Sequence, residues 1–186
     1  GAGLRTEKMP GHWVLARLGK RVLRPGGMQL TRRMLEALRI KNGDDVVEFA
    51  PGMGVTARLT IELDPASYTA VERDEAAAKI VSGYLQGDRQ RCVVGSASDT
   101  GRPEQSATVV YGEAMLTMQT EEMKRDIVRE AHRLLKSGGR YGIHEMCLMH
   151  ESLNDDARQE VERALTGVMA SESFKVIPSP PGHCRN

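Results

Sequence analysis

The sequence predicts an α/β protein whose sheet is doubly wound and mostly parallel. Apolar strand-like runs alternate with helical patterns, and a glycine loop joins the first run to the helix that follows it. Such alternation builds a parallel sheet with right-handed crossovers. We expect helices at about 55–63, 74–86 and 121–136, between strands at 45–49, 68–72, 91–94, 107–111 and 140–146.

Two further helical patterns precede the first strand. Residues 11–23 combine apolar with basic side chains until a Pro-Gly-Gly sequence stops the pattern, and apolar residues recur at helical spacing over 30–38. The basic residues of the first pattern suit a lid over an acidic substrate, although a solvated helix face is the commoner use of such a run. We therefore divide the chain into an N-terminal helical lid or extension over 1–27 and one domain over 28–186.

The composition disfavours several classes of protein. The 186 residues include 26 Lys and Arg against 25 Asp and Glu, so the net charge of +1 provides no general attraction to nucleic acid or to a membrane surface. Cys92, Cys147 and Cys184 are too widely spaced for a zinc site or a disulfide framework. The sequence has neither a run of about eighteen apolar residues nor a signal-like N-terminal core, and we expect a soluble cytoplasmic protein without a metal ion.

The segment from Val46 to Ala57 has the pattern of a strand, a glycine turn and the start of a helix. Gly52 and Gly54 permit a sharp turn and a close approach of the backbone to a ligand. Glu72 stands at the end of the second strand, where a carboxylate can accept hydrogen bonds from both hydroxyls of a ribose. The combination predicts a nucleotide-type cofactor, and Gly52, Gly54 and Ala57 also satisfy the dinucleotide fingerprint G-x-G-x-x-A.

Four places in the chain occur in the order of a known family: Glu48–Gly54, Glu72, Val93–Ala97 and Leu134–Ile143. With them the chain resembles the class I S-adenosylmethionine-dependent methyltransferases over residues 28 to 150. Leu134–Ile143 is similar to the family's connection between a helix and its fifth strand, L-K-P-G-G. The resemblance implies a seven-stranded-type, Rossmann-like sheet and S-adenosylmethionine as the cofactor, with the methyltransferase domain over 28–186.

The end of the chain matches this family less closely. After a helical pattern at about 153–169, only residues 173–177 have a strand pattern, whereas the family closes its sheet with two more strands. Either the sheet is trimmed at its C-terminal strands, or residues are absent from the sequence.

The resemblance also implies a set of cofactor contacts. Glu48 at the strand tip would hold the methionine ammonium group, directly or through water. Ala50 replaces a glycine of the family pattern. Ser96 replaces an acid that often binds the adenine amino group, so that Asp99 makes this contact or the contact is absent. The full set expected at the cofactor is Glu48, Ala50, Gly52, Gly54, Glu72, Arg73, Ser96, Ala97 and Glu113.

The acceptor is expected over the carboxyl ends of the fourth and fifth strands. Glu113, His144 and Glu145 lie there. We predict His144 and Glu113 as the catalytic acid–base groups, with His144 as the base if the acceptor must lose a proton, although a histidine at a strand end is often structural. Ten methionines, several of them near this end, indicate either flexible core filling or an apolar pocket for a small-molecule acceptor.

Three functions remain open at this point. The favoured one is methyl transfer from S-adenosylmethionine to a small-molecule nucleophile by in-line displacement. The others are a dinucleotide-dependent oxidoreductase and a non-catalytic S-adenosylmethionine-binding protein. The acceptor, the methylated atom and the oligomeric state do not follow from the sequence.

Overall fold

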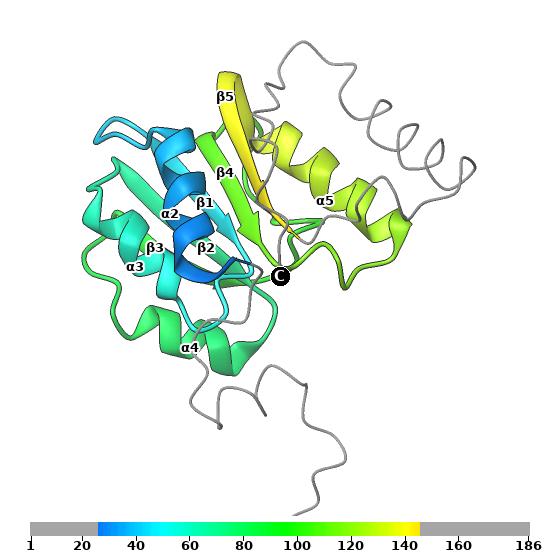
Figure 1. The fold of residues 1–186 in the computed structure, drawn as a ribbon, viewed down its shortest axis with the longest axis horizontal. Coiled ribbons are helices and arrows are strands. Elements are labelled where there is room, and N and C mark those ends of the chain that lie inside the picture. Colours follow the sequence, from blue (N-terminus) through cyan, green and yellow to red (C-terminus); the bar gives the residue numbers. More distant parts are fainter. Residues whose placement is uncertain (1–25, 146–186) are drawn as a thin grey trace, which may run out of the picture.

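A computed structural model gives the structure of residues 26–145 of the chain. These residues form one five-stranded sheet with helices packed around it (Figure 1). The helices expected over 11–23 and 153–169 and the strand expected over 173–177 lie outside the described residues. In chain order the elements are α2 (Gly27–Leu38), β1 (Asp45–Phe49), α3 (Val55–Glu62), β2 (Ser67–Glu72), α4 (Glu75–Ser82), β3 (Gln90–Val94), β4 (Ala107–Glu113), α5 (Glu121–Leu134) and β5 (Leu135–His144).

All neighbouring strands are parallel, in the spatial order β3-β2-β1-β4-β5. The chain adds β2 and β3 on one side of β1 and then crosses over to add β4 and β5 on the other side. The strand order therefore reverses between β1 and β4, and ligands of open α/β sheets bind beyond the carboxyl ends of the strands at such a point. The expected α/β class with a parallel, doubly wound sheet is confirmed.

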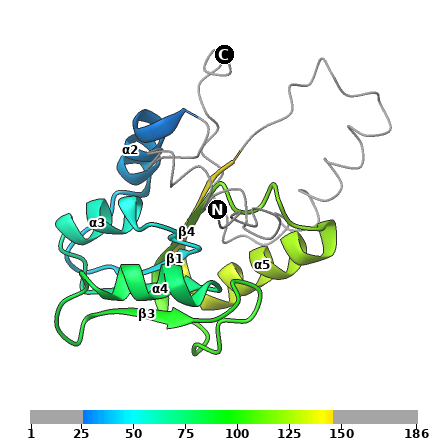
Figure 2. The same cartoon turned by 90° about the horizontal axis from the view of Figure 1, so that it is seen from below.

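Side chains alternate between the two faces of the sheet, and each face has its own core. Val46 and Tyr68 pack with residues of α2, α3 and α4, whereas Val47 and Phe49 pack with residues of α5. Figure 2 shows α2 and α3 separated from α5 by β1 and β4. The inner strands are thus apolar on both faces, as is typical of strands buried in a parallel sheet. Within the described part of the chain, no helix has the length and apolar character needed to cross a bilayer.

The largest boundary difference from the sequence-based expectation concerns β5. Helix α5 ends at Leu134, and β5 covers Leu135–His144 rather than 140–146. After its first residue has paired with β4 the register shifts, and pairing becomes regular only from Arg140. Gly138, with a φ of 76°, lies in the irregular stretch. Residues 136–139, which the sequence predicts as a connection, are part of β5 because Leu135 already pairs with Ala107 of β4 directly after the helix.

Asp44, just ahead of β1, joins three strands at the amino-terminal edge of the sheet. Its carboxylate accepts hydrogen bonds from the Thr108 hydroxyl of β4 at 2.6 Å and from the Arg140 guanidinium of β5 at 2.7 Å. The backbone amide of Lys41 donates to it at 2.8 Å. Burial acts to raise the pKa of Asp44, but these hydrogen bonds and the arginine charge outweigh burial and lower the pKa. Asp44 therefore stabilises the fold in its charged form.

Replacing Asp44 by Asn should lower the free energy of unfolding near pH 7 by about 1–3 kcal/mol, because hydrogen bonds to a charged group are lost. The native pKa of Asp44 is lowered, so its contribution is complete above the unfolded-chain pKa of about 3.9 and disappears as the pH falls through the native value. Urea denaturation of both proteins between about pH 7 and about pH 3 measures this difference. A difference that stays constant below about pH 4 would contradict the assignment.

Candidate functional site

Three carboxylates are buried at the carboxyl ends of neighbouring strands. Glu48 of β1 is 3% exposed and Glu72 of β2 is 7% exposed, while the side chain of Glu113 in β4 is 6% exposed. Removing a charged carboxylate from water is unfavourable unless hydrogen-bond donors replace the water. The donors come from the surrounding helices, strands and loops, and they determine the geometry of the site.

Glu48 lies in a layer of buried hydroxyl groups below α3. Its Oε2 atom accepts hydrogen bonds from the Tyr68 hydroxyl at 2.5 Å and from the Tyr111 hydroxyl at 2.7 Å. Burial, followed by the charge of Glu48, raises the pKa of both tyrosines, so both stay protonated and donate. The Thr60 hydroxyl of α3 lies 2.6 Å from the Tyr111 hydroxyl. Tyr111 thus links Glu48 to α3, and the contact of Glu48 with a ligand ammonium group stays a prediction.

Glu72 holds the glycine loop through both of its carboxylate oxygens. Oε2 accepts from the backbone amide of Gly52, and Oε1 accepts from that of Asp74, each at 3.0 Å. The Ala50 amide donates to the Val71 carbonyl at 2.8 Å, which extends the contact between the loop and β2. Because each carboxylate oxygen can accept about two hydrogen bonds, Glu72 can receive ligand hydroxyls in addition to these amides.

Gly52 and Gly54 have different surroundings. Gly52 has a φ of 56°, and among residues 26–145 no atom outside its chain neighbours lies within 4 Å of the position that a Cβ atom would occupy. Gly54 has a φ of 73°, and a Cβ atom there would lie 1.5 Å from the Tyr84 hydroxyl. That hydroxyl donates to the Gly54 carbonyl at 3.1 Å, and the Arg58 guanidinium lies 4.5 Å from the centre of the Tyr84 ring. Gly52 therefore borders open space, whereas Gly54 is required by the packing of the loop.

Three residues near the loop have a conformation, an exposure or a contact that the sequence did not predict. Ala50, which replaces a glycine, has a φ of 51°, a conformation that costs a residue with a Cβ atom about 1–2 kcal/mol. Arg73, expected at the cofactor, is exposed directly after β2. Tyr84 was not expected at the loop. It lies within the helical pattern over 74–86, and no neighbouring residue marks it as a contact of the loop.

Gly54→Ala should destabilise the protein more than Gly52→Ala. Both substitutions place a Cβ atom in the left-handed region, at about 1–2 kcal/mol each. Only at Gly54 must the new methyl group displace Tyr84, which adds about 1–3 kcal/mol of overpacking. Chemical denaturation measures both variants against the parent protein. In a Tyr84→Ala background the difference between them should disappear, and an unchanged difference would show that Tyr84 is not its cause.

Glu113 and His144 form a buried pair at the ends of β4 and β5. His144 Nδ1 lies 2.7 Å from Glu113 Oε1, and the His144 side chain is 8% exposed. The same oxygen accepts from the Thr31 hydroxyl of α2 at 2.8 Å, and Oε2 accepts from the Thr56 hydroxyl of α3. The structure thus brings together the two residues predicted as acid–base groups. It also adds Thr31 and Thr56, for which the sequence offered no signal.

Glu145, a third candidate acid–base residue, has a different position. Its Oε1 atom accepts from the backbone amides of Met115 and Leu116, each at 2.6 Å. Its Oε2 atom accepts from the Thr117 hydroxyl at 2.7 Å. Since both oxygens bind this loop, we assign Glu145 to holding the loop after β4 rather than to proton transfer.

The segment after β3 begins beside Glu72, whose carbonyl accepts from the Gly95 amide at 2.9 Å. Ser96 and Asp99 form a backbone bridge across a tight turn, and Ala97 packs against the core on the α5 side. Ser96 and Ala97 therefore follow closely on the strand end where Glu72 lies. Their contacts with adenine, and that of Asp99, stay predictions.

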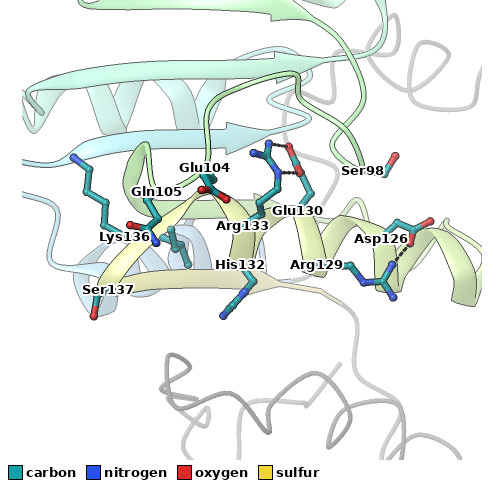
Figure 3. Close-up of a pocket in the computed structure, with 11 residues that line it drawn as sticks. Ser98, Glu104, Gln105, Asp126, Arg129, Glu130, His132, Arg133, Lys136 and Ser137 are labelled. Atoms are coloured by element: carbon teal, nitrogen blue, oxygen red, sulfur yellow. Dashed lines mark hydrogen bonds and ion pairs between the residues drawn. The ribbon is translucent and has the colours of Figure 1, made fainter.

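A depression on the α5 side is lined mainly by residues of α5 and of the start of β5 (Figure 3), and none of the three acids lines it. Lys136 and Ser137 line it at the start of β5, which is the opposite edge of the sheet. Glu130 and Arg133 of α5 form an ion pair at 2.7 Å on its wall. Glu130 also accepts from the Thr100 amide at 2.9 Å, so this pair attaches the segment after β3 to α5. We assign the depression a structural role.

Besides the three acids, the described residues include other side chains of metal-binding types and the thiol of Cys92. Within residues 26–145, no group of three or more His, Cys, Asp and Glu side chains could hold a metal ion. Burial, followed by the charge of Glu72, raises the pKa of the Cys92 thiol to about 11, so the thiol is protonated near neutral pH. Cys147 and Cys184 lie outside the described residues.

Comparison with known proteins identifies relatives of the region that contains the site. Residues 47–143 match the model of a family described as a methyltransferase domain. A protein from Haemophilus influenzae, described only as an uncharacterized protein, is 30% identical over 163 residues. The match covers 84% of this chain and 65% of the relative, so the chain spans slightly less than two thirds of the relative's length.

Solved structures with a similar fold have low sequence identity. Geranyl diphosphate C-methyltransferase from Streptomyces coelicolor, solved with Mg2+, geranyl diphosphate and S-adenosyl-L-homocysteine, has a TM-score of 0.62 at 18% identity. The match covers 76% of this chain and 57% of that protein. The YcgJ protein from Bacillus subtilis has a TM-score of 0.59 at 19% identity, with 72% of this chain and 57% of that chain covered. At such identities the similarity is one of fold alone.

Proposed function

The chain belongs to the methyltransferase domain family, and we propose that it transfers a methyl group from S-adenosylmethionine to a small-molecule acceptor. Membership confirms the expected family of class I S-adenosylmethionine-dependent methyltransferases, and S-adenosylmethionine is the cofactor of that family. Beyond family and cofactor, we propose the acceptor class, the in-line mechanism and the roles of individual residues.

The row of three buried carboxylates beside an open glycine loop carries the proposal. S-adenosylmethionine has a positive sulfur atom and a positive ammonium group, and it has no phosphate. Glu48, Glu72 and Glu113 give the site negative charge, which favours such a cation. The pyrophosphate of a dinucleotide would be repelled by the same charges, which disfavours the oxidoreductase alternative. The residues present therefore fit S-adenosylmethionine.

Each part of the cofactor has residues that suit it. Glu72 would bind the ribose hydroxyls, because it stands at a strand end and holds the loop at the same time. Gly52 borders the open space that a ligand needs. Glu48, near the end of β1 just ahead of the loop, would attract the ammonium group by its negative charge. The remaining proposed contacts are those of Ala50, Gly54, Arg73, Ser96, Ala97 and Glu113.

Bound S-adenosylmethionine supplies a methyl group that the positive sulfur already activates. The protein therefore needs chiefly to hold the acceptor in line, with the reacting atoms about 3–3.5 Å apart. His144 would take a proton from an acceptor that must lose one. In the tautomer in which Nδ1–H donates to Glu113, Nε2 is the basic nitrogen, and the charge of Glu113 stabilises the imidazolium that forms.

A small and partly apolar acceptor suits the surface at this end of the sheet. Met53 of the glycine loop is 41% exposed, and Met118 in the segment after β4 is 75% exposed. Flexible methionine side chains adapt to irregular apolar ligands. The net charge of +1 offers no electrostatic attraction to a nucleic acid backbone.

Replacing Glu72 by Ala should weaken the binding of S-adenosylhomocysteine by roughly 10- to 150-fold, because hydrogen bonds to a charged acceptor are lost. Isothermal titration calorimetry measures the affinity. Glu75→Ala is the matched control: it removes an exposed acid three residues further on, at the start of α4, and should change the affinity by less than about twofold. Equal affinities of the Glu72 variant and the parent protein would remove Glu72 from the cofactor site.

Replacing His144 by Gln should leave cofactor affinity nearly unchanged and slow methyl transfer by at least about 100-fold. Glutamine can still donate a hydrogen bond to Glu113 but cannot serve as a base. Transfer of a labelled methyl group to a panel of small nucleophiles would identify an acceptor and then compare the two proteins. Normal turnover in the variant would leave positioning alone as the catalytic contribution of the protein.

A further inference from the structure

Glu113 joins four elements of the fold through one carboxylate. It ends β4, and its two oxygens contact Thr31 of α2, Thr56 of α3 and His144 of β5. Thr31 is 0% exposed and Thr56 is 2% exposed, so water does not compete for their hydrogen bonds. These residues lie far apart in the sequence. The Glu113 carboxylate therefore joins α2, α3 and β5 at the end of β4.

Thr56 connects Glu113 to the glycine loop. It is the second residue of α3, and the N-cap residue Gly54 has no side chain to cap the helix. The first backbone amides of α3 are thus not bound by a capping side chain. Holding Thr56 against Glu113 therefore fixes the direction in which the loop enters the helix.

Thr31 connects the same carboxylate to α2. This helix packs mainly against β5, and its N-cap residue Gly26 also lacks a capping side chain. The Thr31 hydroxyl lies 3.2 Å from the Gly27 carbonyl and 2.8 Å from Glu113 Oε1. A hydroxyl has one hydrogen to donate, and the shorter contact with a charged oxygen is the stronger one. The position of the first half of α2 therefore depends on Glu113.

We propose that Glu113 is a positioning residue that couples the glycine loop to α2, so that a ligand bound at the loop also orders the first half of α2. Thr56 transmits the position of the loop to the carboxylate, and Thr31 transmits it to the helix. His144, bound to the same oxygen as Thr31, brings the acceptor side into the same coupling. The identity of the ligand rests on the proposed function, whereas the coupling between α3 and α2 does not.

Hydrogen exchange measured by mass spectrometry tests the coupling without any ligand. Thr56→Val keeps the size of the side chain and removes the hydroxyl that donates a hydrogen bond to Glu113. Exchange should rise by roughly 10-fold over residues 28–35 of α2 as well as over residues 50–58, because the carboxylate loses a donor and its remaining contacts loosen. Thr31→Val should have the reciprocal effect on residues 50–58.

Thr108→Val provides the matched control. It removes a hydrogen bond of 2.6 Å between a threonine and a carboxylate, that of Asp44, at the opposite end of the same strand. Exchange over residues 28–35 and 50–58 should stay close to that of the parent protein. The coupling is refuted if Thr56→Val affects only α3, or if Thr108→Val loosens α2 to the same extent.

Adding S-adenosylhomocysteine separates this inference from the proposed function. In the parent protein the ligand should slow exchange at the loop and over residues 28–35. In Thr31→Val, which removes the hydrogen bond between α2 and Glu113, it should still slow exchange at the loop but no longer in α2. Protection of the loop alone in the parent protein would overturn the coupling and leave the cofactor assignment standing. Protection nowhere would overturn the cofactor assignment, while the Thr56→Val result would still decide the coupling.

Discussion

A carboxylate that leaves water needs hydrogen-bond donors, and this chain buries three carboxylates at one edge of its sheet. Tyrosine hydroxyls donate hydrogen bonds to Glu48, and backbone amides donate to Glu72. Two threonines and a histidine form the hydrogen bonds of Glu113. Because these donors lie on different elements, satisfying the acids also fixes α2, α3 and the glycine loop on the sheet. Loss of one donor leaves a buried charge poorly compensated, which costs more than breaking an exposed ion pair. The three carboxylates and their hydrogen-bond donors therefore determine the geometry of the site.

The two edges of the sheet differ in how their acids are compensated. At the amino-terminal edge, Asp44 pairs with Arg140 and Asp45 pairs with Lys136, each at 2.7 Å, so charges cancel. At the carboxyl edge most donors are neutral hydroxyls and amides, which solvate a carboxylate without cancelling its charge. His144 alone of the donors named there can become cationic. The edge that carries the glycine loop is thus the more negative one, and it suits a positively charged ligand.

Short sequence patterns predicted the sheet and the position of the glycine loop. The alternation of strands and helices gave the parallel sheet, and the glycine turn with an acid one strand later placed Gly52 beside Glu72. Tyr84 and Thr31 could not be predicted in the same way. The partner of Tyr84 is 30 residues away and that of Thr31 is 82 residues away, and neither has a sequence pattern of its own. Such contacts follow from helix packing, which a single sequence does not determine.

Strand register decides which of two adjacent residues can serve the acceptor. Side chains alternate along β5, and the pairing of Glu113 with His144 puts the imidazole on the face covered by α2 and α3. Glu145 then falls on the opposite side with Tyr141, whose pKa is raised by burial and by the charge of Glu145. A shift of one residue would exchange the two positions. The proposal of His144 rather than Glu145 as the base therefore depends on the register of β4 with β5 rather than on which residue is intrinsically the better base.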